Sequence, residues 1–230
     1  MHVLLDHLAA VIVSSVLVLM FATLQMRGLQ SSSETTVNHV VRSSALDIAQ
    51  ILERDLENMR TDAQVQEAIN RGVLTGGVGF ACNAVASGDT TFQFTFPTLT
   101  DPQNVVSLSD PMDAPVAIVR YELNPTGETE TRWLDGVEVT HSLFNIQRFV
   151  GTTLTGGSQG GVTDFRISFA PSGSPTFTPA SGACPSNLDK VRFQLQMTLP
   201  GLDMQVDQQQ SVSQLHFSRH GSTVDLINWE

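Results

Sequence analysis

The sequence predicts an α+β fold in which one long N-terminal helix, half membrane-embedded and half amphipathic, packs on an antiparallel β-sheet. Three observations support this fold class. An uncharged apolar run extends from Leu8 to Leu24. Apolar residues then recur at spacings of three, four and seven as far as Met59, which is typical of a helix with one buried stripe. From Gly76 onward the chain is rich in Thr, Val, Phe, Gly and Pro, so we expect strands to replace helices.

The apolar run is long enough to anchor the chain in a membrane. At 1.5 Å per residue its positions cover roughly 26 Å of the ~30 Å hydrocarbon core, and Val3 to Leu5 can extend it. A cleaved signal peptide is the alternative interpretation. It is disfavoured because the residues before Leu8 include Asp6 but no Lys or Arg, and because no small-x-small cleavage pattern follows the run. We therefore expect a retained, single-pass anchor.

The amphipathic half of the helix carries the stripe that should cover the sheet. Its members are Val37, Val41, Ile48, Leu52, Leu56 and Met59, while most charged residues fall on the other face. A continuous helix from Val3 to Arg60 would span on the order of 85 Å. Gly28 and the run Ser31–Ser33 are where we expect a bend or a melted turn, because both favour helix poorly.

The rest of the chain predicts one short helix and then strands. Thr61 to Gln64 has the form of a capping box, followed by a helix over Ala63–Arg71 and a stop at Gly72. Alternation of apolar and polar residues predicts strands over Thr91–Phe96, Ala117–Leu123, Asp164–Ala170 and Val191–Leu199, and another over Val212–Phe217; Asp135-Gly136 marks a tight hairpin, and residues 156–161 and 171–185 are expected loops. We accordingly divide the chain into a transmembrane or filament-core helix (1–28), an amphipathic helix with the short second helix (29–75) and an extracytoplasmic antiparallel β domain (76–230).

Charge and cysteine content narrow the possible partners and the compartment. The net charge is −11, with eleven Arg and a single Lys, so nucleic acid is not an expected partner. The two cysteines, Cys82 and Cys184, are most simply a disulfide of an exported domain, and two buried free thiols are the alternative.

No constellation of residues in the sequence indicates an enzyme, a cofactor or a metal centre. His216 and His220 lie four apart, but in a strand that spacing does not chelate a metal. Gly77-Val-Gly79 lacks the third glycine of a dinucleotide-binding loop. Calcium bound by Asp101, Asp110 and Asp113 is an open alternative to a solvated acidic loop. The alternating Phe92, Phe94 and Phe96, together with Trp133 and Trp229, are expected to pack in the core or at its edge.

The arrangement resembles the type IV pilin superfamily, and within it the larger minor pilins and the J-type minor pseudopilins. The residues that carry the resemblance are the anchor leading into Ile51–Met59, the segment Gly77–Phe80, the strands Val162–Phe169 and Lys190–Met197, and the closing Ser222–Asn228. The leader peptide, the processing glycine and the Phe-Thr-Leu-x-Glu of the family have no counterpart here. Asp6 is the nearest equivalent of the glutamate at the fifth mature position of the family.

The resemblance implies a pilin-like fold and a structural role. The chain would be a subunit of a type IV pilus-like filament or a type II secretion-like pseudopilus, located in the inner membrane before assembly and in an extracellular or periplasmic filament afterwards. Its partners would be copies of itself or other pilin-like subunits. Assembly would use Asp6 and the small residues Ala9, Ala10, Ser14 and Ser15, which let helices approach closely. The alternative is a monomeric, membrane-tethered binding module outside the cytoplasm, and an anchored hydrolase is a third possibility for which no catalytic set is found.

Overall fold

The structure is a computed structural model that describes residues 2–60, 62–72, 82–99, 116–134, 137–158, 161–198 and 218–226. Within these ranges two helices precede ten strands. The helices are α1 (His2–Glu57) and α2 (Asp62–Asn70). The strands are β1 (Asn83–Ser87), β2 (Thr90–Leu99), β3 (Val116–Leu134), β4 (Val137–Val150), β5 (Thr153–Gly157), β6 (Val162–Pro171), β7 (Thr178–Pro179), β8 (Gly182–Ala183), β9 (Leu188–Met197) and β10 (Ser218–Asp225).

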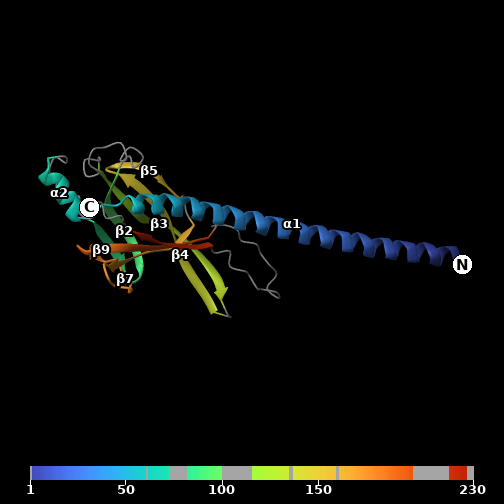
Figure 1. The fold of residues 1–230 in the computed structure, drawn as a ribbon. Helices are drawn as coiled ribbons and strands as arrows, with labels where there is room; N and C mark the ends of the chain where they lie inside the picture. The colour runs from blue at the N-terminus through green and yellow to red at the C-terminus, as the bar shows by residue number, and fades with distance from the viewer. Residues whose placement is uncertain are drawn as a thin grey trace. The chain divides into compact units, whose positions relative to one another are not determined.

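The chain divides into two compact units, Met1–Val40 and Val41–Glu230. The described part of the first unit is helical throughout, and α1 continues as helix through Gly28 and Ser31–Ser33 (Figure 1). The melted turn expected there is therefore absent. The hydroxyls of Thr35 and Thr36 donate to the carbonyls of Ser31 and Ser32 at 2.8 and 2.9 Å, which gives these side chains partners inside the helix itself.

The second unit is built on one antiparallel sheet with the strand order β10-β9-β6-β4-β3-β2-β1-β8; β5 also pairs with β4, and β7 with β6. The sheet is nearly split in the middle, because β4 and β6 pair only at Phe144 and Val162. Side chains of β2 bridge the opening. The Thr91 hydroxyl accepts the N–H of Ile167 at 3.0 Å, and the Thr90 hydroxyl donates to Asp164 Oδ1 at 3.1 Å.

The core of this unit combines the buried sides of the strands with the last turns of α1. Phe94 and Phe96 of β2 are fully buried, their ring centroids lie 4.7 Å apart, and Phe96 stacks on Tyr121 at 6.3 Å. Each such aromatic side chain stabilises the fold by about 1.5 to 3 kcal/mol through burial. The buried apolar side chains that α1 adds are Val41, Ala45, Ile48, Ala49, Leu52 and Leu56.

The predicted α+β, pilin-like fold class is wrong. The chain is mostly a large antiparallel sheet with one N-terminal helix, and not a helix packed on a small sheet. The sequence pattern underestimated the sheet because many of its strands lack alternation. Four of the strands, β1, β5, β7 and β8, have five residues or fewer. The last two residues of β5 also belong to the segment 156–161, which was expected to be a loop. Antiparallel pairing with a longer neighbour supplies the hydrogen bonds that such short segments cannot secure alone.

The strands with clear alternation are confirmed. β2, β3, β6 and β9 contain the four strands first predicted, up to Met197 in β9, and they run longer than the pattern indicated. The predicted hairpin is present as well, since Leu134 of β3 pairs with Val137 of β4. The short helix α2 lies within one residue of its predicted range, and Gly72 after it has a φ of 76°. The predictions for Thr61, Gly77–Phe80, the Asp101–Asp113 loop, Val212–Phe217 and Trp229 lie outside the described residues.

Candidate functional site

The first candidate site is the apolar part of α1. Val11–Leu29 has a mean hydropathy of 1.7 over 19 residues, and none of it is buried. Exposed apolar side chains occur on every side of the helix, among them Val18 at 69%, Leu19 at 65% and Phe21 at 68%. A helix that is apolar all round is stable only when lipid or other protein covers it. Among the described residues this is the one helix long and apolar enough to cross a membrane, and a signal sequence has the same properties.

The residues predicted to mediate assembly all lie in this helix. Asp6, Ala9 and Ala10 are helical, but their side chains lie outside the description. Ser14 and Ser15 are exposed. The Ser15 hydroxyl donates to the Val11 carbonyl at 2.8 Å, so its hydrogen bond is satisfied within the helix and leaves a small surface for a neighbour.

The second candidate site is a buried polar cluster where α1 meets the sheet inside the second unit. The Asp55 carboxylate, 4% exposed, accepts hydrogen bonds from Tyr121 Oη at 2.7 Å and from Arg148 Nε and Nη2 at 2.5 and 3.0 Å. The Asp55 carbonyl accepts the Thr98 hydroxyl at 3.0 Å. One helical residue is thereby bonded to β2, β3 and β4. We call Asp55, Tyr121 and Arg148 the clasp.

Sequence reasoning missed the clasp, although one signal for it was present. Asp55 lies seven residues after Ile48, three after Leu52 and four before Met59, so it occupies the apolar stripe and not the polar face with most of the charged residues. A carboxylate in a buried stripe needs a partner. Its two partners lie more than sixty residues away in the sequence, and no local pattern identifies them.

Electrostatics makes the clasp a structural element and not a reactive one. Burial and the adjacent Asp55 carboxylate both raise the pKa of the Tyr121 phenol far above its usual range. The phenol is therefore neutral and donates a hydrogen bond to the Asp55 carboxylate, which also pairs with the Arg148 guanidinium. Neither the Tyr121 phenol oxygen nor the paired Asp55 carboxylate is available as a nucleophile or a general base.

The raised pKa of Tyr121 predicts a loss of stability at high pH. The unfolded chain releases this proton near pH 10.0, whereas the folded chain retains it. Stability should be unaffected below that pH and fall above it by about 1.4 kcal/mol per pH unit. Because Tyr121 is the one tyrosine of the chain, tyrosinate absorbance follows it directly. We expect no absorbance change before the alkaline unfolding transition.

The matching control uses Lys190, the one lysine of the chain, whose ammonium group also titrates at high pH. The hydrogen bond from Lys190 to Asp225 raises its pKa as well. Lys190→Arg keeps this ion pair and removes the titration, so it should leave the Tyr121 profile unchanged, whereas Tyr121→Phe should remove most of the pH dependence. Titration of Tyr121 near pH 10 in the folded chain would contradict the assignment.

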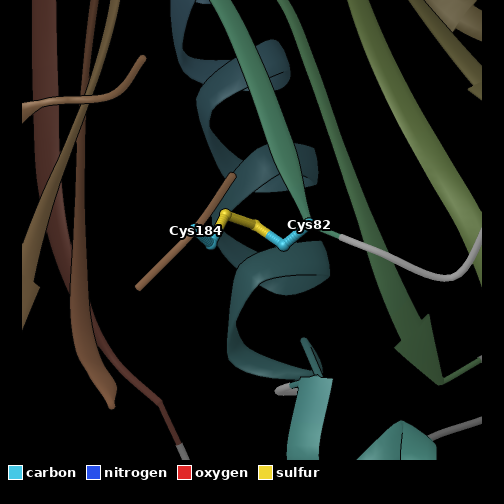
Figure 2. Close-up of a disulfide and its surroundings, with 2 residues drawn as sticks. All are labelled: Cys82 and Cys184. Atoms are coloured by element: carbon cyan, nitrogen blue, oxygen red, sulfur yellow. A yellow bond between two sulfur atoms is a disulfide. The ribbon is translucent and has the colours of Figure 1, made fainter. Parts of the chain in front are cut away.

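The cysteines form a disulfide that joins two strands of the second unit that are far apart in the sequence. Cys82 precedes β1 and Cys184 follows β8, and their Cα atoms lie 5.3 Å apart (Figure 2). The Cys184 N–H also donates to the Cys82 carbonyl at 3.1 Å, next to the paired Asn83 and Ala183. The bond is shielded, since the two cysteines are 1% and 8% exposed. A shielded disulfide of this kind is typical of an exported domain.

The remaining predicted residues do not come together as a site. His220 lies on β10 with its ring 6.1 Å from Phe193, and His216 lies outside the described residues. The described residues contain no group of three or more His, Cys, Asp or Glu placed to hold a metal ion. Phe94 and Phe96 belong to the core, and the half-buried Phe92 packs edge-on against Phe144 at 5.9 Å.

Comparison with protein-family models, characterised proteins and solved structures finds no match for the chain.

Proposed function

We propose that this chain is a non-enzymatic structural subunit that inserts in the inner membrane and assembles, through α1, into a filament of the type IV pilus or type II secretion pseudopilus kind. The observation that carries the proposal is the complete exposure of Val11–Leu29. In lipid this segment satisfies its own backbone hydrogen bonds. In a filament the same apolar surface packs against neighbouring helices.

The length of α1 supports assembly beyond simple anchoring. It continues as helix past the apolar segment Val11–Leu29 and through the rest of the first unit to Val40. Most of the exposed residues between the apolar segment and Val40 are polar, among them Ser31, Ser32, Thr35, Thr36 and His39. A helix much longer than its membrane-spanning part offers a surface along which copies can stagger.

The proposal is tested by electron microscopy of material sheared from cells that make the protein, with mass spectrometry of the filaments and of the intact N-terminus. Filaments that contain this chain with α1 retained support the proposal. A chain that stays monomeric in membranes, absent from any filament, would instead indicate a tethered binding module. Loss of the first residues up to the end of the apolar segment would indicate a cleaved signal sequence.

Substitutions in α1 separate insertion from assembly. We expect Ser15→Leu to reduce filament mass at least about tenfold while insertion is unchanged or improved, because a bulky side chain keeps helices apart but favours lipid. Val13→Leu, two residues away on the opposite face, is the control and should assemble normally. Filament yield and the membrane-bound fraction are measured in parallel. Normal assembly of Ser15→Leu would show that this face is not at the helix contact.

A further inference from the structure

The hairpin of β3 and β4 continues beyond the rest of the sheet (Figure 1). β2 pairs with β3 only from Val116 to Glu122, and β6 meets β4 only at Phe144. Residues 129–134 and 137–142 therefore pair with each other and with no other described strand. We call this two-stranded segment the ribbon. A ribbon without a third strand has limited stability of its own, so a surface that covers it would stabilise it.

A bulge at the base of the ribbon displays one carboxylate. The register shifts between Pro125 and Thr129, and Gly127 has a φ of 82°. The Thr126 hydroxyl donates to the Leu143 carbonyl at 2.9 Å and accepts the Glu128 N–H at 3.2 Å, which holds the bulge in place. Glu128 is exposed, and none of the described cations pairs with its carboxylate. Bulges commonly re-aim a side chain in this way.

Two arginines on the outer side of β9 and β10 carry positive charges that complement the Glu128 carboxylate. Arg192 Nε donates to the Thr223 hydroxyl at 3.3 Å, and its guanidinium lies 3.7 Å from the Phe177 ring centroid. Arg219 Nη2 donates to Gln194 Oε1 at 3.1 Å. Both arginines thus bond only to uncharged groups among the described residues. By contrast, the strand arginines Arg120, Arg148 and Arg166 each pair with a carboxylate.

These two arginines flank a glycine on the sheet surface. Gly221 pairs with Gln194, between the pairs Arg192–Thr223 and Gln196–Arg219, and it is exposed. The Gln194 side chain lies close over Gly221, since an added Cβ there would be 3.3 Å from Gln194 Cγ, and the two arginines stand two residues to either side along the strands. We call Arg192, Gln194, Arg219 and Gly221 the arginine face. A carboxylate is the group that guanidinium donors bind best.

We propose that the ribbon of one copy docks on the arginine face of a second copy, with Glu128 received between Arg192 and Arg219. Within one copy β4, β6 and β9 lie between β3 and β10, and the two surfaces are not paired. A contact between two different surfaces is heterologous, so it can repeat along a filament. The inference deepens the proposed function, but it concerns the β domains and not α1.

The contact is tested by cross-linking the full-length chain in membranes and in mild detergent. Thr129→Cys, next to Glu128, and Thr223→Cys, paired with Arg192, are made separately, mixed and oxidised, so that Glu128 and both arginines are kept; the native cysteines are bonded and buried and do not compete. We expect a disulfide-linked dimer in the mixture that neither variant forms alone. Absence of this dimer, or equal dimers in each variant alone, would overturn the proposal.

Charge exchange gives a second, independent readout. Arg192→Glu with Arg219→Glu should weaken the self-association of the chain at least about tenfold, because like charges then face each other. Glu128→Arg added to the same chain should restore most of it. The double reversal at Arg120 and Glu122, which are paired within one copy, is the control and should have no effect. Filaments that form without the cross-link would refute this contact alone, and a cross-link without filaments would refute the proposed function alone.

Discussion

Asp55→Ala is expected to lower the free energy of unfolding of the second unit by about 3 to 5 kcal/mol, because it leaves a buried guanidinium and a buried phenol without their acceptor. The Arg148 side chain is 14% exposed and Tyr121 is 2% exposed, so water cannot easily replace the lost carboxylate. The loss also removes the side-chain bonds that hold the last turns of α1 to β3 and β4, while the bond from Thr98 of β2 to the Asp55 carbonyl remains.

Urea unfolding of the full-length chain in detergent, followed by tryptophan fluorescence, measures this change. Arg54→Ala is the matched control. Arg54 also contacts Asp55, at 3.4 Å, but its side chain is 60% exposed, so we expect a change below about 1 kcal/mol. The triple variant Asp55→Leu, Tyr121→Phe and Arg148→Met should recover much of the stability, since it removes every member of the clasp together. Equal effects of Asp55→Ala and Arg54→Ala would show that the clasp does not hold the helix.

Removal of the Cys82–Cys184 disulfide should cost about 4 to 5 kcal/mol, the value that chain entropy assigns to a closed loop of about a hundred residues. The sequence separation of the two cysteines is 102. The bond also holds β1 and β8 together at one edge of the sheet, where only two residue pairs join these strands. Loss of the bond should therefore loosen that edge before the rest of the sheet unfolds.

The double variant Cys82→Ala with Cys184→Ala is compared with the natural chain under oxidising and reducing conditions. Reduction should destabilise the natural chain to about the level of the double variant and leave the double variant itself unchanged. Hydrogen exchange should rise first in β1 and β8. A natural chain whose unfolding does not respond to reduction would contradict the expected contribution of the bond.

Local pattern predicted those elements whose burial shows in the sequence. Phe193, Leu195 and Met197 alternate with polar residues because one side of β9 faces the core, and the strand could be placed for that reason. Spacing of three and four predicted the buried stripe that includes Leu52 and Leu56 in the same way. The apolar segment of α1 was also evident, because a run without charge needs no partner to be recognised.

Pairing over long distances decided the rest. The short strands β1 and β8 exist because each finds a neighbour, and the extent of the sheet, which overturned the predicted fold class, follows from many such pairings. The clasp depends on Asp55 meeting Tyr121 and Arg148, which lie more than sixty residues away in the sequence. The arginine face depends on the pairing of β9 with β10, and the apolar alternation of a strand identifies only its buried side. Periodicity records whether a residue faces water or the core. It does not record which residue it meets there, because that depends on the closure of long loops and on the packing of the whole sheet.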